Sequence, residues 1–446
     1  MKSFLTISTI IFTSILYFSC KPAQKMAKNN PIPAVPVADT PVTPTPVKAA
    51  IVTRTDRLLD EILQAHPQMF DSILSNKEGY KLQIIYTQID RQVKNHPVFK
   101  PYYYNYHPDN YFYPASTVKL PIAIMALQKL NEIKIPGLSK YSTFITEANY
   151  SKQTPVYNDP TTADGKPTIA HYIKKILLVS DNDAYNRLYE FLGQQYINEQ
   201  FQKMGYTHAQ ITHRLESPMN EDENRHTNPL YFLDASGKKI FEQGLQFNQL
   251  PYKKHEAFIG NAYYSGGKLV NQPMDFSKKN KISLEELTQV LKAVLFPEAM
   301  PAKQRFNLTP EDYRFLHQYL SQYPSETIYP AYDSSNYWDS YVKFLYYGAQ
   351  KQPMQKGLRI FNKVGDAYGF LLDVAYVADF ENNIEFMLSA VIYCNSDGTL
   401  NDDNYDYEKT GFPFMKNLGQ VIYNYELKRQ RKEVPDLSNF KMGYDK

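Results

Sequence analysis

The sequence predicts an α+β fold in which an antiparallel sheet combines strands from both ends of the chain. Alternation of apolar residues near the start indicates a first strand, and apolar residues at helical spacing fill the middle. Three apolar, strand-like segments follow near the end, at 357–364, 370–379 and 384–393. The expected architecture is therefore a sheet packed against terminal helices, together with an all-helical subdomain.

Individual elements can be placed in order along the chain. Helical spacing begins at 58–63, and alternation over 82–89 predicts the first strand. The tyrosine-rich stretch 102–113 is expected to continue the sheet. Between 221 and 280 the chain is polar and aromatic with little periodicity, apart from a hairpin predicted at 231–240. Further helices are expected after Ser116 and at 168–178, 182–192, 283–296 and 412–430.

The composition allows one large domain or two ordinary ones. The chain has 446 residues, of which 43% are hydrophobic and 14% aromatic, and this is ample apolar material for a core. Its 49 basic and 46 acidic side chains nearly balance. Because no basic face is indicated, we expect no nucleic-acid partner. We expect a monomer that acts on a small molecule.

The first residues have the features of a secretory signal. Lys2 precedes an apolar run that ends at Phe18, and Ser19 and Cys20 follow. The run is shorter than the ~20 apolar residues that a transmembrane helix needs. The segment resembles a bacterial lipoprotein box, in which the cysteine receives lipid and becomes the first mature residue. We therefore expect a signal peptide over 1–19, lipidation of Cys20, and export to the bacterial envelope as a lipid-anchored protein, either periplasmic or at the cell surface.

A proline-rich segment over 20–50 predicts an extended tether, because such a backbone cannot pack a core. The folded domain is expected to span 51–446. The second cysteine, Cys394, ends an apolar stretch and is expected to be a small buried side chain. If Cys20 is lipidated, Cys394 has no partner for an intrachain disulfide.

Ser116 and Lys119 form a Ser-x-x-Lys pattern at the start of an apolar helical run. The two side chains then lie one turn apart on one helix face. A neutral lysine amine can accept the serine proton there, near the positive end of the helix dipole. A helix-capping serine with a solvated lysine would be the simpler interpretation if the pattern stood alone. The same pattern recurs without this context at Ser236, Ser265, Ser340 and Ser438.

Two further motifs follow Ser116 in the chain. Ser-Asp-Asn occupies 180–182 after an apolar segment, and Lys-Val-Gly occupies 363–365 at the end of a strand-like one. Ser-x-x-Lys, Ser-Asp-Asn and Lys-Thr-Gly together mark class A β-lactamases and penicillin-binding proteins. Each motif alone is common, but the ordered set is improbable by chance. From about residue 55 to about residue 430 the chain therefore resembles a class A β-lactamase-like serine hydrolase.

The resemblance implies a β-lactamase/transpeptidase-like fold and acyl transfer to serine, with no cofactor. By position, Ser116 is the nucleophile and Lys119 is its base or proton relay. Ser180 would pass a proton to the leaving nitrogen, and Asn182 would contact substrate and Lys119. Lys363 would supply positive charge and help to keep Lys119 neutral.

The third motif also implies an oxyanion hole and contacts to substrate. Backbone N–H groups of Ser116 and Asp366 would form the hole, with Gly365 beside them. Val364 replaces the hydroxyl residue that grips the substrate carboxylate in the family, and Leu371 falls where many relatives carry an arginine. We therefore expect poor hydrolysis of ordinary penicillins.

The segment Arg214-Leu-Glu216-Ser-Pro-Met-Asn220 lies where the Ω-loop of class A β-lactamases lies. The resemblance implies that Glu216 and Asn220 hold the water that attacks the acyl-enzyme, and that Arg214 braces the loop by pairing with an acid. An ordinary polar loop is the alternative. The insertion over 221–280 follows directly and could border the pocket.

Two other functions fit parts of the pattern. A cell-wall D-Ala-D-Ala-type peptidase or transpeptidase would use the same serine and lysine, but it would normally lack a deacylating glutamate such as Glu216. A non-catalytic envelope binding protein on the same scaffold would not need the intact motifs. The nine histidines have no zinc-binding spacing, so no metal site is expected.

Overall fold

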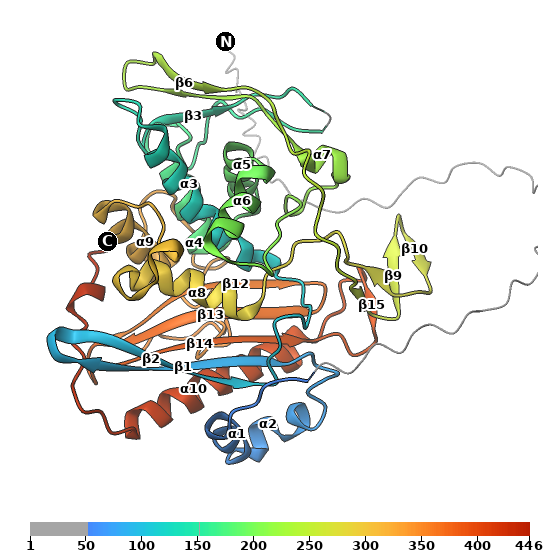
Figure 1. Cartoon of the computed structure of the whole chain (residues 1–446), viewed down its shortest axis with the longest axis vertical. Coiled ribbons are helices and arrows are strands. Elements are labelled where there is room, and N and C mark those ends of the chain that lie inside the picture. The colour runs from blue at the N-terminus through green and yellow to red at the C-terminus, as the bar shows by residue number, and fades with distance from the viewer. Residues whose placement is uncertain (1–51, 151) are drawn as a thin grey trace, which may run out of the picture. The chain divides into compact units, whose positions relative to one another are not determined.

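A five-stranded antiparallel sheet, formed by both ends of the chain, lies at the centre of the structure (Figure 1). The computed structural model describes residues 52–150 and 152–446. The strand order is β12-β13-β14-β1-β2, and β1 pairs with β14 so that Tyr86 lies opposite Leu388. The predicted α+β fold is confirmed. The strands are β1 (Gln83–Gln92), β2 (His96–Tyr104), β12 (Leu358–Ala367), β13 (Phe370–Asp379) and β14 (Ile384–Tyr393).

Helices cover both faces of this sheet (Figure 1). Since successive strand residues point to opposite faces, Ile84 and Tyr86 pack on one side, whereas Ile85 and Ile89 pack on the other. Burial on both faces explains why these strands are nearly continuous apolar runs. The first face carries α1 (Arg57–Gln64), α2 (Pro67–Leu74) and α10 (Phe412–Lys428), and the second carries α8 (Leu284–Leu295) and α9 (Pro310–Ser321).

The middle of the chain forms a largely helical part above the sheet in Figure 1. Its central helix α3 is apolar on nearly all sides because other elements surround it. This part also carries a small sheet, which contains the hairpin predicted at 231–240 and a further strand, so the subdomain is not all-helical. Its elements are α3 (Lys119–Ile133), α4 (Ile169–Val179), α5 (Asn182–Leu192), α6 (Gln194–Met204), β3 (Thr143–Thr146), β5 (Leu230–Leu233) and β6 (Lys239–Gln243).

The prediction that the sheet continues through 102–113 is wrong beyond Tyr104. Strand β2 ends there, and Asn105 adopts a left-handed backbone with a φ of 50°. That conformation ends extended structure. The aromatic residues that follow instead lead the chain toward Ser116, and Phe112 and Tyr113 are buried in the core.

The insertion at 221–280 consists of one short helix and several short strands. The hairpin predicted there is confirmed, since β5 pairs with β6 around a turn in which Gly237 has a φ of 83°. Farther on, β9 pairs in parallel with β15 from the loop after β14. The remaining elements are α7 (Glu221–Arg225), β4 (His226–Thr227), β7 (Gln246–Phe247), β8 (Phe258–Ile259), β9 (Ala262–Ser265), β10 (Lys268–Val270), β11 (Met274–Asp275) and β15 (Thr399–Leu400).

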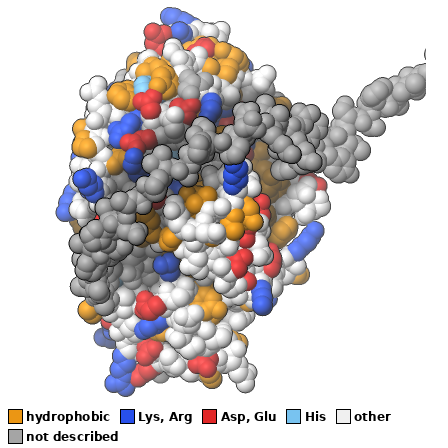
Figure 2. Space-filling view, turned by 90° about the vertical axis from the view of Figure 1, so that its right-hand side faces the viewer, with side chains coloured by type: hydrophobic (Ala, Val, Ile, Leu, Met, Phe, Trp, Pro, Cys, Tyr) orange, Lys and Arg blue, Asp and Glu red, His pale blue; other side chains and the backbone are white. Residues whose placement is uncertain are grey.

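On the face shown in Figure 2, positive and negative side chains are interspersed over the described surface. Cys394 is fully buried with a free thiol, as the sequence predicted. No helix within 52–150 or 152–446 combines the length and apolar character that crossing a membrane requires. The predicted signal peptide, Cys20 and the tether lie outside the described residues.

Candidate active site

Ser116 lies on a tight turn that leads into the buried helix α3. The 3-10 turn spans Ala115–Val118, and Lys119 begins α3 directly after it. Ala115 has a φ of 46°, a conformation that costs a non-glycine residue about 1–3 kcal/mol and that clusters at functional sites. Ser116 is half-buried, so its hydroxyl is held in place and still reachable.

The Lys119 amine contacts three groups of the site at once. Its Nζ lies 2.8 Å from Ser116 Oγ, 2.5 Å from the Ser180 carbonyl oxygen and 2.6 Å from Asn182 Oδ1. The two carbonyl-type oxygens can only accept hydrogen bonds. A neutral amine has two N–H donors for these oxygens, and its lone pair is left for the Ser116 hydroxyl. The geometry therefore suits Lys119 as the acceptor of the Ser116 proton.

Burial favours the neutral form of Lys119, which is the form that can accept a proton from Ser116. The Lys119 side chain is fully buried, and burial lowers its pKa to about 7, against the opposing effect of Asp181, Asp366 and Glu216. Burial also lowers the pKa of Lys363 well below its usual value, and the charge on Lys119 adds to this shift. Burial, and not the predicted help from the charge on Lys363, is therefore the main cause of the Lys119 shift.

Ser180 joins the two lysines. It ends α4 in a left-handed conformation with a φ of 62°, which turns its backbone toward the site. Lys363 Nζ donates to Ser180 Oγ at 2.7 Å, and Lys119 Nζ lies 3.2 Å from the same oxygen. The Ser180 hydroxyl therefore lies on a hydrogen-bonded path between the lysines and can carry a proton away from Lys119.

Gly365 allows strand β12 to lie directly against the nucleophile turn. A Cβ at this position would lie 2.8 Å from Ser116 N, 2.9 Å from Thr117 N and 3.0 Å from the Pro114 oxygen. Because these neighbours are backbone atoms, they cannot move aside for a side chain. The absence of a side chain at 365 therefore sets the distance between Lys363 on the strand and Ser116 on the turn.

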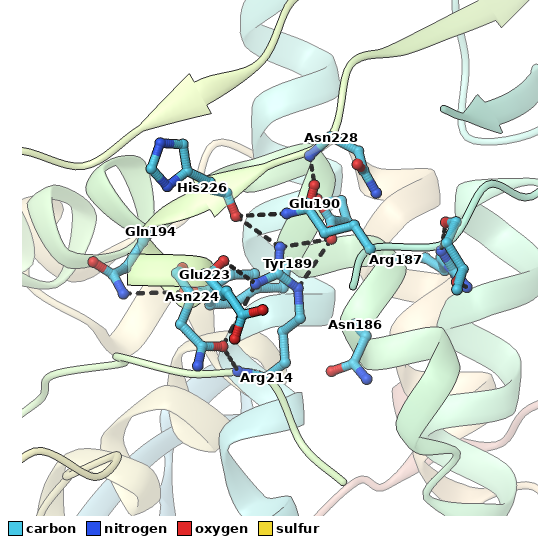
Figure 3. A network of polar contacts seen from close by, with 12 residues as sticks. Asn186, Arg187, Tyr189, Glu190, Gln194, Arg214, Glu223, Asn224, His226 and Asn228 are labelled. Carbon is cyan, nitrogen blue, oxygen red and sulfur yellow. Dashed lines mark hydrogen bonds and ion pairs between the residues drawn. The ribbon is translucent and has the colours of Figure 1, made fainter. Parts of the chain in front are cut away.

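Arg214 anchors the segment that carries Glu216, and Figure 3 shows its guanidinium enclosed by polar groups. Its Nη2 donates to Glu190 Oε1 at 2.6 Å and to the His226 carbonyl at 2.8 Å, while Nε donates to the same Glu190 oxygen at 2.9 Å. Both side chains of this ion pair are buried, with exposed fractions of 2% and 4%. The expected acid partner of Arg214 is therefore Glu190 on α5.

A second contact fixes the backbone next to Glu216. The Asn186 side chain donates to the Leu215 carbonyl and accepts from the Leu215 N–H, both at 2.9 Å. Glu216 itself has a φ of 46° and an exposed side chain. The backbone that leads into the strained Glu216 is thus held through both Arg214 and Leu215.

A cavity of about 440 Å³, here called the Ser116 cavity, contains Ser116, Asn182, Glu216 and Asp366 in its lining. A second cavity of about 390 Å³, the Ser180 pocket, is lined by Ser180 and Asp366 and by apolar residues of the segment before β12. The two cavities meet at Asp366. The fold thus brings distant predicted site residues together in the lining of the Ser116 cavity. Ser116 and Asp366, the two that lie farthest apart in the chain, are separated by 250 positions.

Asn220 is the predicted site residue that the structure places elsewhere. Its Oδ1 accepts from the Glu223 N–H at 2.9 Å, and Glu223 Oε2 accepts from the Asn220 N–H at 2.7 Å, so it caps α7. Asn and Glu three residues apart suit such a cap. Asn220 is not part of the Ser116 cavity lining, and its position gives no support to the predicted role in holding water.

Val364 and Leu371, the two residues that differ from the family pattern around the third motif, have different surroundings. Val364 is buried and contributes to the lining of the Ser180 pocket, where it presents methyl groups. Leu371 is fully buried in the core on the α10 side and lies within close contact of Gly411. An arginine at position 371 would therefore have its Cα in the core, on the α10 side of the sheet, and not at the rim of the site.

The Ser340–Lys343 repeat of the pattern shows what a buried lysine alone does. Burial lowers the pKa of Lys343 to about 7. Its amine donates at 2.8 Å to the Ile360 carbonyl and at 2.7 Å to Asn362 Oδ1, while Ser340 Oγ donates to the Gln350 carbonyl. Lys343 therefore joins a loop to β12, and within the described residues its amine makes no hydrogen bond to the Ser340 hydroxyl. The direct contact between the lysine amine and the serine hydroxyl distinguishes the Ser116–Lys119 pair from this repeat.

Sequence reasoning missed several residues that complete the site. Glu190 and Asn186 belong to no motif, because their partners are distant in sequence. Asp403 and the tyrosines of the Ser116 cavity come from loops with no periodic pattern: Tyr113, Tyr368, Tyr405 and Tyr407. Within the described parts of the chain, no three His, Cys, Asp or Glu side chains converge as a metal site would require.

Comparison with solved structures finds similar chains of low identity. The β-lactamase of Desulfarculus baarsii is 15% identical over 81% of this chain and 98% of its own, with a TM-score of 0.42. The class A β-lactamase of Clostridium kluyveri is 15% identical over 80% of this chain and 98% of its own, with a TM-score of 0.44. The β-lactamase of Burkholderia phymatum is 12% identical over 82% and 98%, with a TM-score of 0.45. No curated protein matches the chain.

A family model matches most of the chain. The model of the beta-lactamase enzyme family matches residues 70–425, which is well over half of the chain. The matched region contains the Ser116 turn, the Ser180 turn and strand β12. The chain therefore belongs to the beta-lactamase enzyme family, and it is a serine hydrolase of that family.

Proposed function

We propose that this protein is a class A-type serine hydrolase that cleaves a β-lactam, or a related amide or ester, through an acyl-enzyme on Ser116. The observation that carries the proposal is the 2.8 Å contact between Lys119 Nζ and Ser116 Oγ, with the two shortest Lys119 contacts made to carbonyl-type acceptors. Glu216 in the same cavity favours hydrolysis over a peptidase or transpeptidase reaction, since it could activate a water.

In the acylation step, Ser116 Oγ attacks the carbonyl carbon and its proton passes to Lys119 Nζ. The C–N or C–O bond of the substrate then breaks. The leaving atom takes a proton through the Ser180 hydroxyl, which restores neutral Lys119. Backbone N–H groups of Ser116 and Asp366 are the proposed donors to the oxyanion.

In the deacylation step, a water attacks the acyl carbon and gives its proton to Glu216. The bond to Ser116 Oγ breaks, and the serine oxygen takes the proton that Glu216 received from the water. The carboxylic acid product leaves, and both Ser116 and Glu216 return to their starting states. No cofactor takes part in this proposed cycle.

The first test is the site of acylation. After the protein is mixed with a panel of β-lactams and simple esters, intact mass spectrometry should show one adduct, and peptide mapping should place it on Ser116. Ser116→Ala should abolish the adduct, whereas Ser236→Ala, at an exposed repeat of the pattern, should leave it unchanged. Label on another serine with Ser116 bare would contradict the proposal.

The acylation rate should depend on pH through Lys119. Since the neutral amine is the base and burial lowers its pKa to about 7, the rate should rise with pH, be half-maximal near that value, and fall about tenfold per pH unit below it. Stopped-flow acylation between pH 5 and pH 9 measures this. An acylation rate that does not change with pH around that value would remove the base role from Lys119.

We further propose that the protein is exported and anchored through lipid on Cys20. The support is the sequence alone: a basic start, a short apolar run and the lipoprotein-like box. Cys20→Ser should move the protein from the membrane fraction to the soluble fraction, because the acyl chains are the proposed anchor. A mutant that stays bound through high-salt and carbonate washes would refute the anchor.

A further inference from the structure

The Ser116 cavity has an unusual charge for a site that is expected to receive carboxylate-bearing substrates. Three carboxylates line it, namely those of Glu216, Asp366 and Asp403, and among the described residues no lysine or arginine belongs to its lining. The nearest amines lie outside this lining: Lys119 and Lys363 beneath it, whose pKa values burial lowers, and Lys279 at the outer side of Tyr368. The walls of the cavity therefore favour a cation over an anion.

Two of these carboxylates, those of Asp366 and Asp403, are exposed and can be reached by a ligand. Asp366 lies between the Ser116 cavity and the Ser180 pocket, where crowding by protein raises its pKa and the charges on Lys119 and Lys363 oppose that rise. Asp403 is exposed to the cavity, and no ion pair to it is found within the described residues. Its charge is therefore available to a ligand.

Aromatic rings complete the walls. Tyr113 and Tyr368 pack edge to face with their centroids 5.1 Å apart. The hydroxyls of Tyr405 and Tyr407 accept backbone N–H groups of Asn401 and of residue 369 at 3.0 and 2.9 Å, which fixes both side chains. Tyrosine faces attract cations, and a carboxylate beside them strengthens this attraction.

One ring of this set already binds a cation within the protein. The Lys279 amine, which belongs to an adjoining cavity, lies 5.1 Å from the centre of the Tyr368 ring. Its contact to the Tyr368 hydroxyl is long, at 3.4 Å. This geometry is that of a cation–π contact, so the tyrosine surface near Ser116 has the chemistry needed for an ammonium group.

The position of Glu216 shows which half of the substrate meets this surface. In the proposed cycle the water beside Glu216 attacks the acyl carbon, while the leaving group departs on the side of Ser180. Glu216 lines the Ser116 cavity, and Ser180 lines the other pocket. The acyl half of the substrate is therefore the part that contacts the carboxylates and the tyrosines.

We propose that the acyl group transferred to Ser116 carries a positively charged nitrogen, which binds between Asp403, Asp366 and the tyrosine rings. This inference rests on the proposed function of Ser116 and names its substrate class: amides, esters or lactams of acids that bear an ammonium group. An anionic acyl group is excluded by the same charges, because its carboxylate would face three others.

Three penicillins with one nucleus test the inference. Ampicillin, benzylpenicillin and carbenicillin carry an amine, a hydrogen or a carboxylate on the same carbon of the acyl side chain. At about pH 6.5, where an α-amine is mostly protonated, the second-order rate of Ser116 acylation should decrease in that order. Ampicillin should react at least about tenfold faster than carbenicillin.

Asp403→Asn should reduce this ratio several-fold. Asp403 has a φ of 61°, which asparagine also adopts, so the loop keeps its shape. Asp402→Asn is the matched control, since Asp402 lies next to it but outside the cavity lining, and it should leave the ratio unchanged.

Equal rates for the three penicillins, or fastest reaction with carbenicillin, would overturn the inference while Ser116 acylation stands. An Asp403→Asn variant that slows all three compounds equally would also overturn it, because the residue would then act through loop structure. If simple esters label Ser116 but ampicillin does not, the inference is overturned and the proposed function stands. If neither the penicillins nor the esters label Ser116, the proposed function itself fails, and the inference falls with it.

Discussion

Glu216→Gln is expected to trap the acyl-enzyme. Acylation of Ser116 should remain within a few-fold of the wild-type rate, because Lys119 supplies the base. Deacylation should slow by at least ~100-fold, which is the lower end of what a positioned acid–base group contributes. The adduct formed with a β-lactam can be isolated by gel filtration, and its decay can be followed by intact mass spectrometry.

The matched control for this variant is Glu221→Gln at the start of α7, five residues farther along the chain. Glu221 pairs with Lys278 and Arg225 and is not part of the Ser116 cavity lining, so its loss should leave deacylation unchanged. Unchanged turnover in Glu216→Gln would show that Glu216 is an ordinary loop residue. A parallel loss of acylation would indicate instead that Glu216 also serves as the base in the first step.

Of the substitutions proposed for this protein, Arg214→Met should cause the largest decrease in the free energy of unfolding. It leaves Glu190 buried without its cation, and breaking a buried ion pair from one side typically costs about 3–5 kcal/mol. Burial already raises the pKa of Glu190, so the carboxyl is expected to become protonated on loss of Arg214. Urea unfolding followed by circular dichroism gives the change in the free energy of unfolding.

Two comparisons make this test specific. The double variant Arg214→Met/Glu190→Met removes both charges and should recover much of the loss. Arg57→Met removes one partner of an exposed pair, with side chains 90% and 57% accessible, and should change stability little. A small effect of Arg214→Met would contradict the view that this pair anchors the Glu216 segment.

The sequence predicted the sheet and the principal helices because their signals are local. Strand β13, expected at 370–379, spans those residues, and the helix expected at 283–296 is α8, Leu284–Leu295. Both are apolar patterns set by burial. The sequence did not predict that Asn105 ends the sheet early, since a single left-handed residue leaves no periodic trace.

The sequence predicts site residues that lie close together in the chain. It does not predict pairs of residues that only the tertiary fold brings into contact. Ser116 and Lys119 are three positions apart, so helix geometry alone brings them together. Arg214 was expected to meet an acid, but Glu190 lies on another element. The pairing depends on the tertiary fold, which a single sequence does not reveal. The spacing between Glu216 and Asn220 predicted that both hold a water. In the structure Asn220 instead caps α7 through hydrogen bonds with Glu223.

The parallel pairing of β15 with β9 bears on how this protein can evolve. It joins the insertion to the loop that carries Asp403 and Tyr405, and the Asn401 amide adds a 3.1 Å bond to the Tyr264 carbonyl. This wall of the cavity shares no residue with the Ser116–Lys119 pair. On the proposed function, substitutions in the insertion therefore change which acyl groups are accepted and leave the proton-transfer residues intact, so a new substrate preference need not pass through an inactive enzyme.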